Sequence, residues 1–149
     1  FEKSMERLKP LFPEQDATLL HVEKIRNHSV NPEMRIKIKN SRNPVFLFAE
    51  HYPQYDIEQR IITEIESLCE DNKPSIGFFA ALEEPFLQKF GTEKIIGLMR
   101  QMGMKEDEVI SHGMVTKSII NAQKKLAQKV TQEITAKSQE EWMAINLPK

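Results

Sequence analysis

The sequence predicts an α/β domain that is followed by a long C-terminal helix. Two apolar runs, VFLFA at residues 45–49 and SIGFFAAL at residues 75–82, have the length of strands that are buried on both faces. Such strands are typical of parallel sheets that are covered by helices. Beyond Gly113, no proline or glycine interrupts the chain as far as Ile145, and its apolar residues recur at helical spacing.

The elements at the N-terminus are shorter. Residues 1–12 place apolar side chains at helical spacing before Pro13, which predicts a helix that ends at the proline. Residues 18–22 are an apolar run with the length of a strand. Residues 34–39 alternate apolar with basic side chains, as a half-buried strand does. We expect a loop between these two strands.

A helix is predicted after the first apolar run. Asp56 is its expected N-cap, because Gln59 follows three residues later. Apolar residues at positions 57, 61, 65 and 68 form one stripe, and the helix is expected to end before Pro74. Cys69 closes the stripe, where a buried and unreactive thiol is more common than a nucleophile.

Helices are also predicted for the rest of the chain. Two short ones, EEPFLQKF and TEKIIGLMRQM, are separated by Gly91 and followed by Gly103, with Thr92 as the expected cap of the second. The last helix would contain about 30 residues and measure about 45 Å, which is longer than a domain of this size needs. We therefore expect it to pack across another structure.

The composition limits the classes of partner. The chain has 149 residues, with 21 Lys and Arg, 22 Asp and Glu and a formal net charge of -1, which removes the electrostatic argument for nucleic acid. No stretch approaches the ~20 apolar residues that span a bilayer, so only peripheral membrane contact is expected. A single cysteine fits a reducing, cytoplasmic location. Because the chain begins with Phe1, we interpret it as a piece of a longer protein.

No catalytic, cofactor or metal site is predicted. The chain has four histidines, at positions 21, 28, 51 and 112. None of them lies three or four residues from another, so they do not form the converging ligand set that a metal ion needs. Glu83 and Glu84 are an acidic pair, but acids in the first turn of a helix interact favourably with its dipole. A structural role explains the pair without catalysis.

Two surfaces are candidates for binding. The first is an anion patch for phosphate or lipid headgroups, made by Arg35, Lys37, Lys39 and the nearby Arg42. The first three would stand on one face of the strand predicted at residues 34–39. A solvated edge strand whose lysines discourage aggregation explains the same residues. The second candidate is a protein-binding stripe on the C-terminal helix, at Val115, Ile119, Leu126, Val130 and Trp142. Trp142 is equally well explained as a cover for the end of its own helix.

A denser pattern runs through residues 78–126. It contains the pairs LE and FG, then LM, MGM, MVTK and NAQK, in the order FFAALEEPFLQKFGTEKIIGLMRQMGMKEDEVISHGMVTKSIINAQKKL. This stretch resembles the SecA preprotein translocase ATPase, in which segments of the type RFYLSLED, LMRIFGSDRV, MRxLGM and MVTKAIxNAQRKV follow one another. The resemblance covers a third of the chain. It implies a remnant of a helicase-like (RecA-like) second motor domain at residues 1–112, followed by a scaffold-type helix at residues 113–149.

The resemblance also implies a loss of catalytic chemistry. Where the family carries the run Q-L-R-G-R-x-G-R, this chain has RIITEIESLCEDNK, so Glu64 and Ser67 fall near the arginine positions. Arginines there stabilise charge on the transferring phosphoryl group, an effect worth ~10³ to 10⁵ in rate, whereas a glutamate repels that group. The phosphate-binding motif G-x-x-x-x-G-K-[ST] is absent from this sequence, and in the family it lies in a preceding domain.

Three functions remain open. The favoured one is a non-catalytic SecA-like module of a larger protein that binds a protein partner. The main alternative is a part of an active SecA-type motor for ATP-driven preprotein translocation, in which a longer parent protein supplies the missing arginines and the ATPase activity. The third is a weak binder of anionic phosphate or lipid headgroups.

Overall fold

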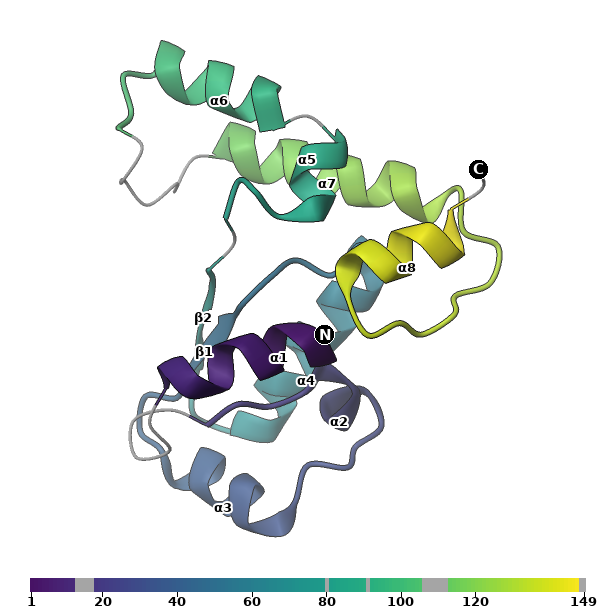
Figure 1. The fold of residues 1–149 in the computed structure, drawn as a ribbon. Coiled ribbons are helices and arrows are strands. Elements are labelled where there is room, and N and C mark those ends of the chain that lie inside the picture. The colour runs from purple at the N-terminus through teal and green to yellow at the C-terminus, as the bar shows by residue number, and fades with distance from the viewer. Residues whose placement is uncertain (13–17, 80, 91, 106–112, 148–149) are drawn as a thin grey trace.

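The computed structural model describes residues 1–12, 18–79, 81–90, 92–105 and 113–147. The N-terminal half of the chain lies in the lower part of Figure 1, and helices from the C-terminal half lie above it. The start of the chain lies beside a segment near residue 137, since the backbone N–H of Lys3 donates to the carbonyl oxygen of Lys137 at 3.0 Å. The fold is mostly helical.

The two apolar runs form a small parallel sheet. β1 (Val45–Phe48) pairs with β2 (Ser75–Phe78), and the register runs from Val45 with Ser75 to Phe48 with Phe78. The connection between them contains α4 (Tyr55–Cys69), because parallel strands need a crossover of a dozen or more residues. The predicted parallel α/β arrangement is present, although both strands are shorter than the apolar runs.

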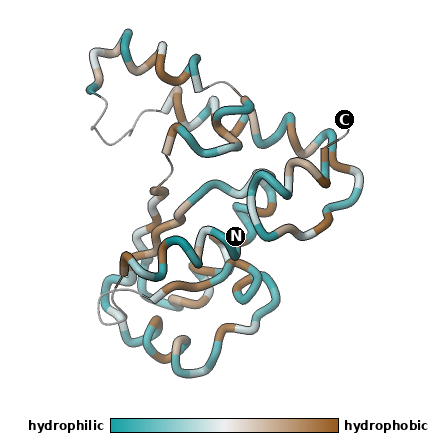
Figure 2. Tube along the Cα trace, viewed as in Figure 1, coloured by the Kyte–Doolittle hydropathy of each residue, from teal (hydrophilic) through white to brown (hydrophobic). Residues whose placement is uncertain are grey.

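Only one face of this sheet is covered. Phe46, Phe48 and Ile76 pack against the apolar side of α4. On the other face, 65% of Val45 and 69% of Leu47 is exposed. Hydrophobic residues mark this part of the trace in Figure 2. The prediction of strands buried on both faces is wrong, because no described element of the chain covers the outer side chains.

The stripe predicted for α4 is confirmed. Ile57, Ile61 and Ile65 are 5%, 1% and 2% exposed. The helix begins two residues earlier than expected, at Tyr55, with Gln54 in place of Asp56 as a cap that makes no side-chain bond, and it ends at Cys69. Cys69 is fully buried, and burial raises the pKa of its thiol. The interpretation of this cysteine as a core residue is confirmed.

The N-terminal helix is confirmed, whereas the two strands predicted after it are wrong. The first segment forms α1 (Glu2–Leu8) and a 3-10 turn, η1 (Lys9–Leu11). The segments predicted as strands contribute to α2 (Val22–Arg26) and α3 (Pro32–Asn40). Side-chain caps decide the outcome: His21 accepts from the N–H of Glu23 at 3.2 Å, and Asn31 accepts from the N–H of Met34 at 2.7 Å.

The two short helices in the middle are confirmed. They are α5 (Pro85–Phe90) and α6 (Thr92–Gln101). Gly103 has a φ of 71° and lets the N–H of Met104 reach the carbonyl oxygen of Met99 at 3.0 Å, which ends α6. The role predicted for Gly103 as a helix stop is therefore also confirmed.

The single long C-terminal helix is wrong. The chain forms α7 (Gly113–Ala127) and α8 (Gln139–Asn146) with a folded connection between them. Asn146 holds this connection, because its side chain accepts from the N–H of Ile134 at 2.6 Å and donates to the carbonyl oxygen of Ile134 at 2.8 Å. Ser138 caps α8 by accepting from the N–H of Glu141. These bonds turn α8 back onto α5.

The described residues form two apolar cores. The lower core is built on α4 and contains Ile25, Val30, Tyr52, Ile57, Ile61 and Ile65. The upper core joins the C-terminal helices and contains Phe86, Leu87, Ile95, Met99, Val115, Leu126, Trp142 and Met143. Phe1 is partly buried against both cores. Within the described residues, none of the helices is long and apolar enough to cross a membrane.

Trp142 is the largest side chain that is fully buried in the upper core, and its removal should weaken the fold strongly. We expect Trp142→Ala to lower the free energy of unfolding by about 3–5 kcal/mol, because the truncation leaves a cavity. Ile145→Ala on the same helix is the control, since Ile145 is 44% exposed and its loss should cost less than about 1 kcal/mol. Urea denaturation measures both values, and equal losses would contradict the burial of Trp142.

Candidate functional site

The loop between β1 and α4, at residues 49–54, lies between the two cores. His51 and Tyr52 of this loop are only 8% and 7% exposed, and Pro53 is fully buried. Side chains from distant parts of the chain bond to its backbone. We name this set the polar junction, and it consists of His51, Tyr52, Glu58, Glu84, Gln123, Glu133 and Gln139.

Gln139, the first residue of α8, joins three segments. Its side-chain amide donates to the carbonyl oxygen of His51 at 2.9 Å and to the carboxyl group of Glu84. Its side-chain oxygen accepts from the N–H of Phe86 at 2.7 Å. A fully buried glutamine is thus bonded to the β1–α4 loop, to the turn before α5 and to the start of α5. Gln139 therefore fixes α8 against the β1–α4 loop and against the start of α5.

Glu58 and Glu84 hold the backbone of the loop from two sides. Oε1 of Glu84 accepts from the N–H of His51 at 2.8 Å. Oε2 of Glu58 accepts from the N–H of Tyr52 at 2.8 Å and lies 3.2 Å from Nδ1 of His51. The imidazole ring stacks on Phe78, with ring centres 4.4 Å apart. Each carboxyl group therefore has a backbone donor, as a buried carboxyl group requires.

The second half of the junction centres on Glu133, which lies in the α7–α8 connection. Its carboxylate accepts from the hydroxyl of Tyr52, from Arg26 at 3.2 Å and from Nε1 of Trp142 at 2.9 Å. Burial and the bond to Glu133 raise the pKa of Tyr52, so its hydroxyl stays a donor. Gln123 of α7 donates to the carbonyl oxygen of Tyr52 at 2.8 Å. Residues from both cores thus meet at Tyr52.

Within the polar junction, the pKa of Glu84 is the one that is shifted into the neutral range. Burial raises the pKa of Glu84 from 4.5 to about 7, and the bonds from Gln139 and His51 oppose this shift. Its second carboxyl oxygen, Oε2, is buried and has no hydrogen-bond partner within the described residues. Glu84 is therefore close to half-protonated at neutral pH.

The hydrogen bonds of the polar junction hold backbone segments in place. Its donors and acceptors are directed at backbone groups or at one another, and they hold the β1–α4 loop between helices from the other end of the chain. Among the described residues, no group of three or more His, Cys, Asp and Glu side chains could hold a metal ion. This arrangement fixes polypeptide segments relative to one another.

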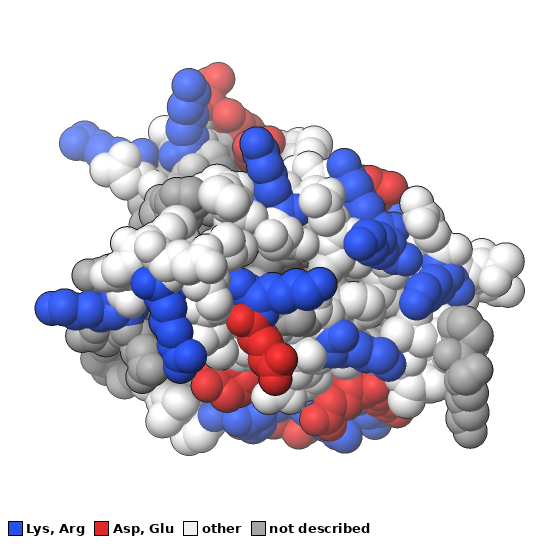
Figure 3. Space-filling model, turned by 90° about the horizontal axis from the view of Figure 1, so that it is seen from above, with Lys and Arg blue, Asp and Glu red and all other residues white. Residues whose placement is uncertain are grey.

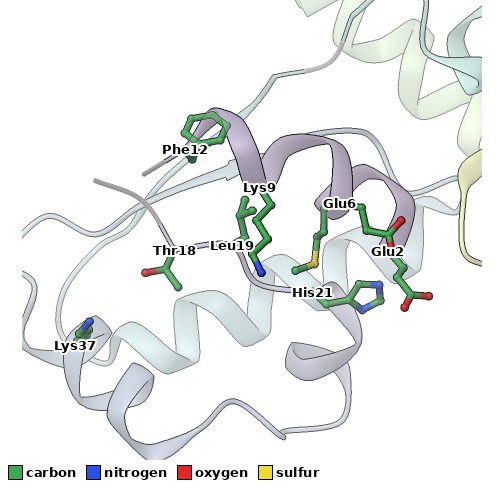
Figure 4. A pocket seen from close by; sticks show the side chains of 9 residues that line it. Glu2, Glu6, Lys9, Phe12, Thr18, Leu19, His21 and Lys37 are labelled. Carbon is green, nitrogen blue, oxygen red and sulfur yellow. The ribbon is translucent and has the colours of Figure 1, made fainter. Parts of the chain in front are cut away.

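A groove of about 820 Å³ lies apart from the junction, beside α1 and η1. Figure 4 shows that its lining side chains come from α1, η1, the segment before α2, and α3. Glu2 and Glu6 face it together with Lys9 and Lys37, so the groove has no single sign of charge. His21 lines it, but its Nδ1 caps α2, and burial lowers the pKa of its ring. The groove does not favour one class of ligand.

Curated proteins similar to this chain share one short stretch with it. The Protein translocase subunit SecA of Acidithiobacillus ferrooxidans is 49% identical over 49 residues, which are 33% of this chain and 5% of that protein. The subunit of Acinetobacter baylyi is 47% identical over 49 residues, with the same shares. That of Maridesulfovibrio salexigens is 46% identical over 52 residues, which are 35% of this chain and 6% of that protein.

The chain contains a SecA-like segment. The matched stretch spans about 5% of the length of these SecA proteins. No protein-family model matches the chain, and no solved structure matches it. The similarity to SecA is therefore shown for about a third of the chain.

The positions where the SecA resemblance predicts arginines are part of α4. Glu64 is paired with His28, with 3.3 Å between its Oε2 and Nδ1 of the imidazole. Ser67 is exposed on the same helix, and both residues line a groove of about 310 Å³ between α3 and α4. The same groove is lined by Arg35 and Lys39 of α3.

The anion patch is not formed as predicted. Because residues 32–40 form α3, Arg35 and Lys39 share one side of a helix and Lys37 lies on another. Arg35 donates to the carbonyl oxygens of Val30 and His28, and Lys39 is 2.9 Å from Glu70. Lys37 lines the larger groove, and Arg42 follows the helix. The structure does not bring the four cations together on one face.

The protein-binding stripe predicted on the C-terminal helix points inwards. Val115, Leu126 and Trp142 are 3%, 0% and 0% exposed. Ile119 and Val130 are partly buried against the same upper core. The stripe is divided between α7 and α8, and both parts belong to the same upper core, in which α7 packs on α6 and α8 packs on α5. These five side chains stabilise the fold and are not available to a partner.

The residues of the polar junction were missed in the sequence. Glu84 looked like one of two solvated acids, and Gln139 lay within a predicted continuous helix. Their partners are 33 and 88 residues away, so no local spacing reveals them. The only local signal is Ser138 followed by Glu141, a capping box that marks a helix start at α8.

Glu84 should make the stability of the chain depend on pH. Because the pKa of Glu84 is raised in the fold, its contribution is fully present below about 4.5 and is lost as the pH rises to about 7. We expect the free energy of unfolding to fall by roughly 1–3 kcal/mol more in the wild type than in Glu84→Gln between about pH 5 and pH 8. Denaturant titrations at several pH values measure this difference.

The neighbouring Glu83 gives the matched control for this measurement, because its side chain is exposed. Glu83→Gln should keep the pH dependence of the wild type. If Glu84→Gln and the wild type lost the same free energy over this pH range, Glu84 would not be the group that titrates.

Proposed function

We propose that the chain is a SecA-related, non-catalytic protein-interaction module with a role in protein translocation. The observation that supports this proposal is the uncovered outer face of the sheet. Val45, Leu47 and Phe79 are 65%, 69% and 76% exposed. The N–H of Phe79 donates to the carbonyl oxygen of Phe48 at 2.7 Å, so Phe79 extends the ladder of β2. Alternation along the strands places these three side chains on one face.

An apolar outer face is unusual for a parallel sheet. Parallel sheets occur almost only with helices over both faces, and here α4 covers one of them. A Cβ atom at Gly77 would lie 3.1 Å from Cδ2 of Leu47, so the glycine leaves room for Leu47 to lie over β2. The exposed side chains therefore form a continuous apolar surface. The element that fits it is an amphipathic helix from another polypeptide segment, because burial of apolar area stabilises such a contact by about 25 cal/mol per Å².

The role in translocation rests on the SecA-like segment. Its relatives are named as translocase subunits, and the segment makes up about 5% of their length. The non-catalytic character rests on α4, which offers Glu64 and Ser67 where the resemblance predicts arginines. The module would thus act through binding and would leave nucleotide hydrolysis to another polypeptide.

A part of an active SecA-type motor is the second candidate. It is favoured by the identity of 45–49% over 49 residues with translocase subunits. In that case a longer parent protein would supply the phosphate-binding loop and the arginines, and this chain would couple their action to movement.

The outer face of the sheet can be tested with a synthetic amphipathic helix that contains only Leu, Ala and Gln. We expect Leu47→Ser combined with Phe79→Ser to weaken its binding about tenfold or more, because the two apolar contacts are lost. Leu11→Ser combined with Ile134→Ser is the matched control, since these residues are 69% and 53% exposed elsewhere. Fluorescence anisotropy measures the affinities. Equal affinities for both double variants would remove the support for this surface.

Nucleotide binding separates the two candidates. We expect no heat of binding in isothermal titration calorimetry with ATP and Mg²⁺, and no phosphate release, either for this chain or for the longest expressible protein that contains it. ATP turnover by that longer protein that is lost when this segment is deleted would contradict the non-catalytic proposal and favour the motor.

A further inference from the structure

The polar side of α7 carries one sign of charge. Residues 113–132 contain four lysines and neither Asp nor Glu, in a chain whose formal net charge is -1. Lys117, Lys124 and Lys125 lie on the helix, and Lys129 follows it in the turn that its N–H makes to the carbonyl oxygen of Leu126 at 2.9 Å. We name these four residues the α7 lysine face. Such a concentration of charge makes a local positive potential in a nearly neutral chain.

The orientation of α7 puts these lysines in solvent. Val115 and Leu126 direct one side of the helix into the upper core, at 3% and 0% exposed. Lys117 and Lys124 are seven residues apart, which is about two turns or 10 Å, so they lie on the same side of the helix. With about 3.6 residues per turn, this side is nearly opposite the buried one, whereas Lys125 lies about 100° further round the helix and Lys129 follows its end. All four lysines are exposed.

Three of these lysines have no acidic partner within the described residues, namely Lys117, Lys125 and Lys129. Lys124 lies over the ring of Tyr55, with its amino group 4.8 Å from the ring centre. Figure 3, which looks down on the side of the molecule with α6 and α7, shows Lys and Arg side chains spread across the view and fewer Asp and Glu. The positive charge of this face is therefore not neutralised by neighbours that the structure describes.

We propose that the α7 lysine face is a docking surface for an acidic segment of a polypeptide. This inference rests on the proposed function, because it assumes a module that binds polypeptide segments. It adds a second binding surface and names the chemistry of the segment that this surface would bind. The complementary charge of an acidic segment would steer its approach and set its specificity. The polar residues between the lysines, Asn121 and Gln128, are exposed and offer hydrogen bonds to carboxylates and to backbone.

The surroundings of the lysines favour a polypeptide over other anions. The apolar side of α7 is turned into the core, so the helix does not offer the apolar stripe that inserts into a lipid surface. The large aromatic side chains that are exposed, Phe12, Phe78 and Phe79, belong to other elements. Tyr55 lies beside the lysines, but it is half-buried and Lys124 lies over its ring, so a base does not find a free ring there. The lysine face therefore offers charge and hydrogen bonds, and an acidic peptide provides groups that match both.

The test measures the affinity of the full chain for a labelled peptide of alternating Glu and Ser, by fluorescence anisotropy at about 50 mM salt. We expect it to bind about tenfold tighter than the same peptide with Gln in place of Glu, and to weaken about tenfold at about 300 mM salt. The triple variant Lys117→Gln, Lys125→Gln, Lys129→Gln should bind the acidic peptide about tenfold more weakly. Lys124 is left unchanged because it contacts Tyr55.

A second triple variant separates position from net charge. Lys3→Gln, Lys24→Gln, Lys73→Gln removes the same charge from exposed residues of other elements and should stay within about twofold of the wild type. Equal losses in both triple variants would overturn the proposal, as would an absence of binding. Binding that is about tenfold tighter to phosphatidylserine vesicles or to single-stranded DNA than to the peptide would overturn the choice of a polypeptide.

Failure of this inference can be told apart from failure of the proposed function. The variant with Leu47→Ser and Phe79→Ser should bind the acidic peptide like the wild type, because the two surfaces are on different elements. The lysine triple variant should still bind the uncharged amphipathic helix. A loss of binding to both ligands in either variant would show that the variant has not folded, which circular dichroism checks. The charge-conserving triple variant Lys117→Arg, Lys125→Arg, Lys129→Arg then serves as the comparison, and it should bind the acidic peptide like the wild type.

Discussion

The capture of the β1–α4 loop by distant side chains is the constraint on which the rest of the structure depends. His51 and Tyr52 are bonded to residues 33 to 88 positions away along the chain. Few other contacts join the lower and upper cores, apart from Phe1 and the packing of α4 on α7. A buried polar network of this kind is stabilising only when its members are satisfied, because each buried group left without a partner costs about 1–3 kcal/mol. Two oxygens of the junction, Oε2 of Glu84 and Oε1 of Gln123, are buried without a partner among the described residues, and they are the weak points of the network.

The same constraint explains why the sheet is open on one side. The residues that the chain can bury are used in two places, around α4 and in the C-terminal helices. α8 folds back onto α5 and the loop, so it does not reach the outer face of β1 and β2. A two-stranded sheet is marginal by itself and needs packing against a helix, which α4 supplies on the inner face. What remains outside is an apolar surface without a structural role in the chain itself.

Local signals predicted those parts of the fold that local energies decide. The stripe of Ile57, Ile61 and Ile65 is long enough to define α4, and Gly103 ends α6 because only a glycine adopts its φ easily. At α3 the alternation of apolar and basic residues imitated a strand, but an asparagine cap followed by Pro32 starts a helix there. The break between α7 and α8 depends on Asn146 reaching back to Ile134, and the junction depends on Gln139 reaching His51. Such long-range bonds leave no periodic trace in the sequence.

The parts of the chain inside and outside the SecA resemblance have different tasks. Residues 78–126, which carry the resemblance, include α5, α6 and α7, and these helices supply most of the upper core. Five of the seven members of the junction, among them His51, Glu133 and Gln139, lie outside that stretch. In this chain α8 and the β1–α4 loop lie next to these helices, so their apolar residues are held in place by a polar network that is anchored outside the SecA-like stretch. On α7, Lys117 lies nearly opposite Val115 and Leu126, so its charge stays outside the upper core.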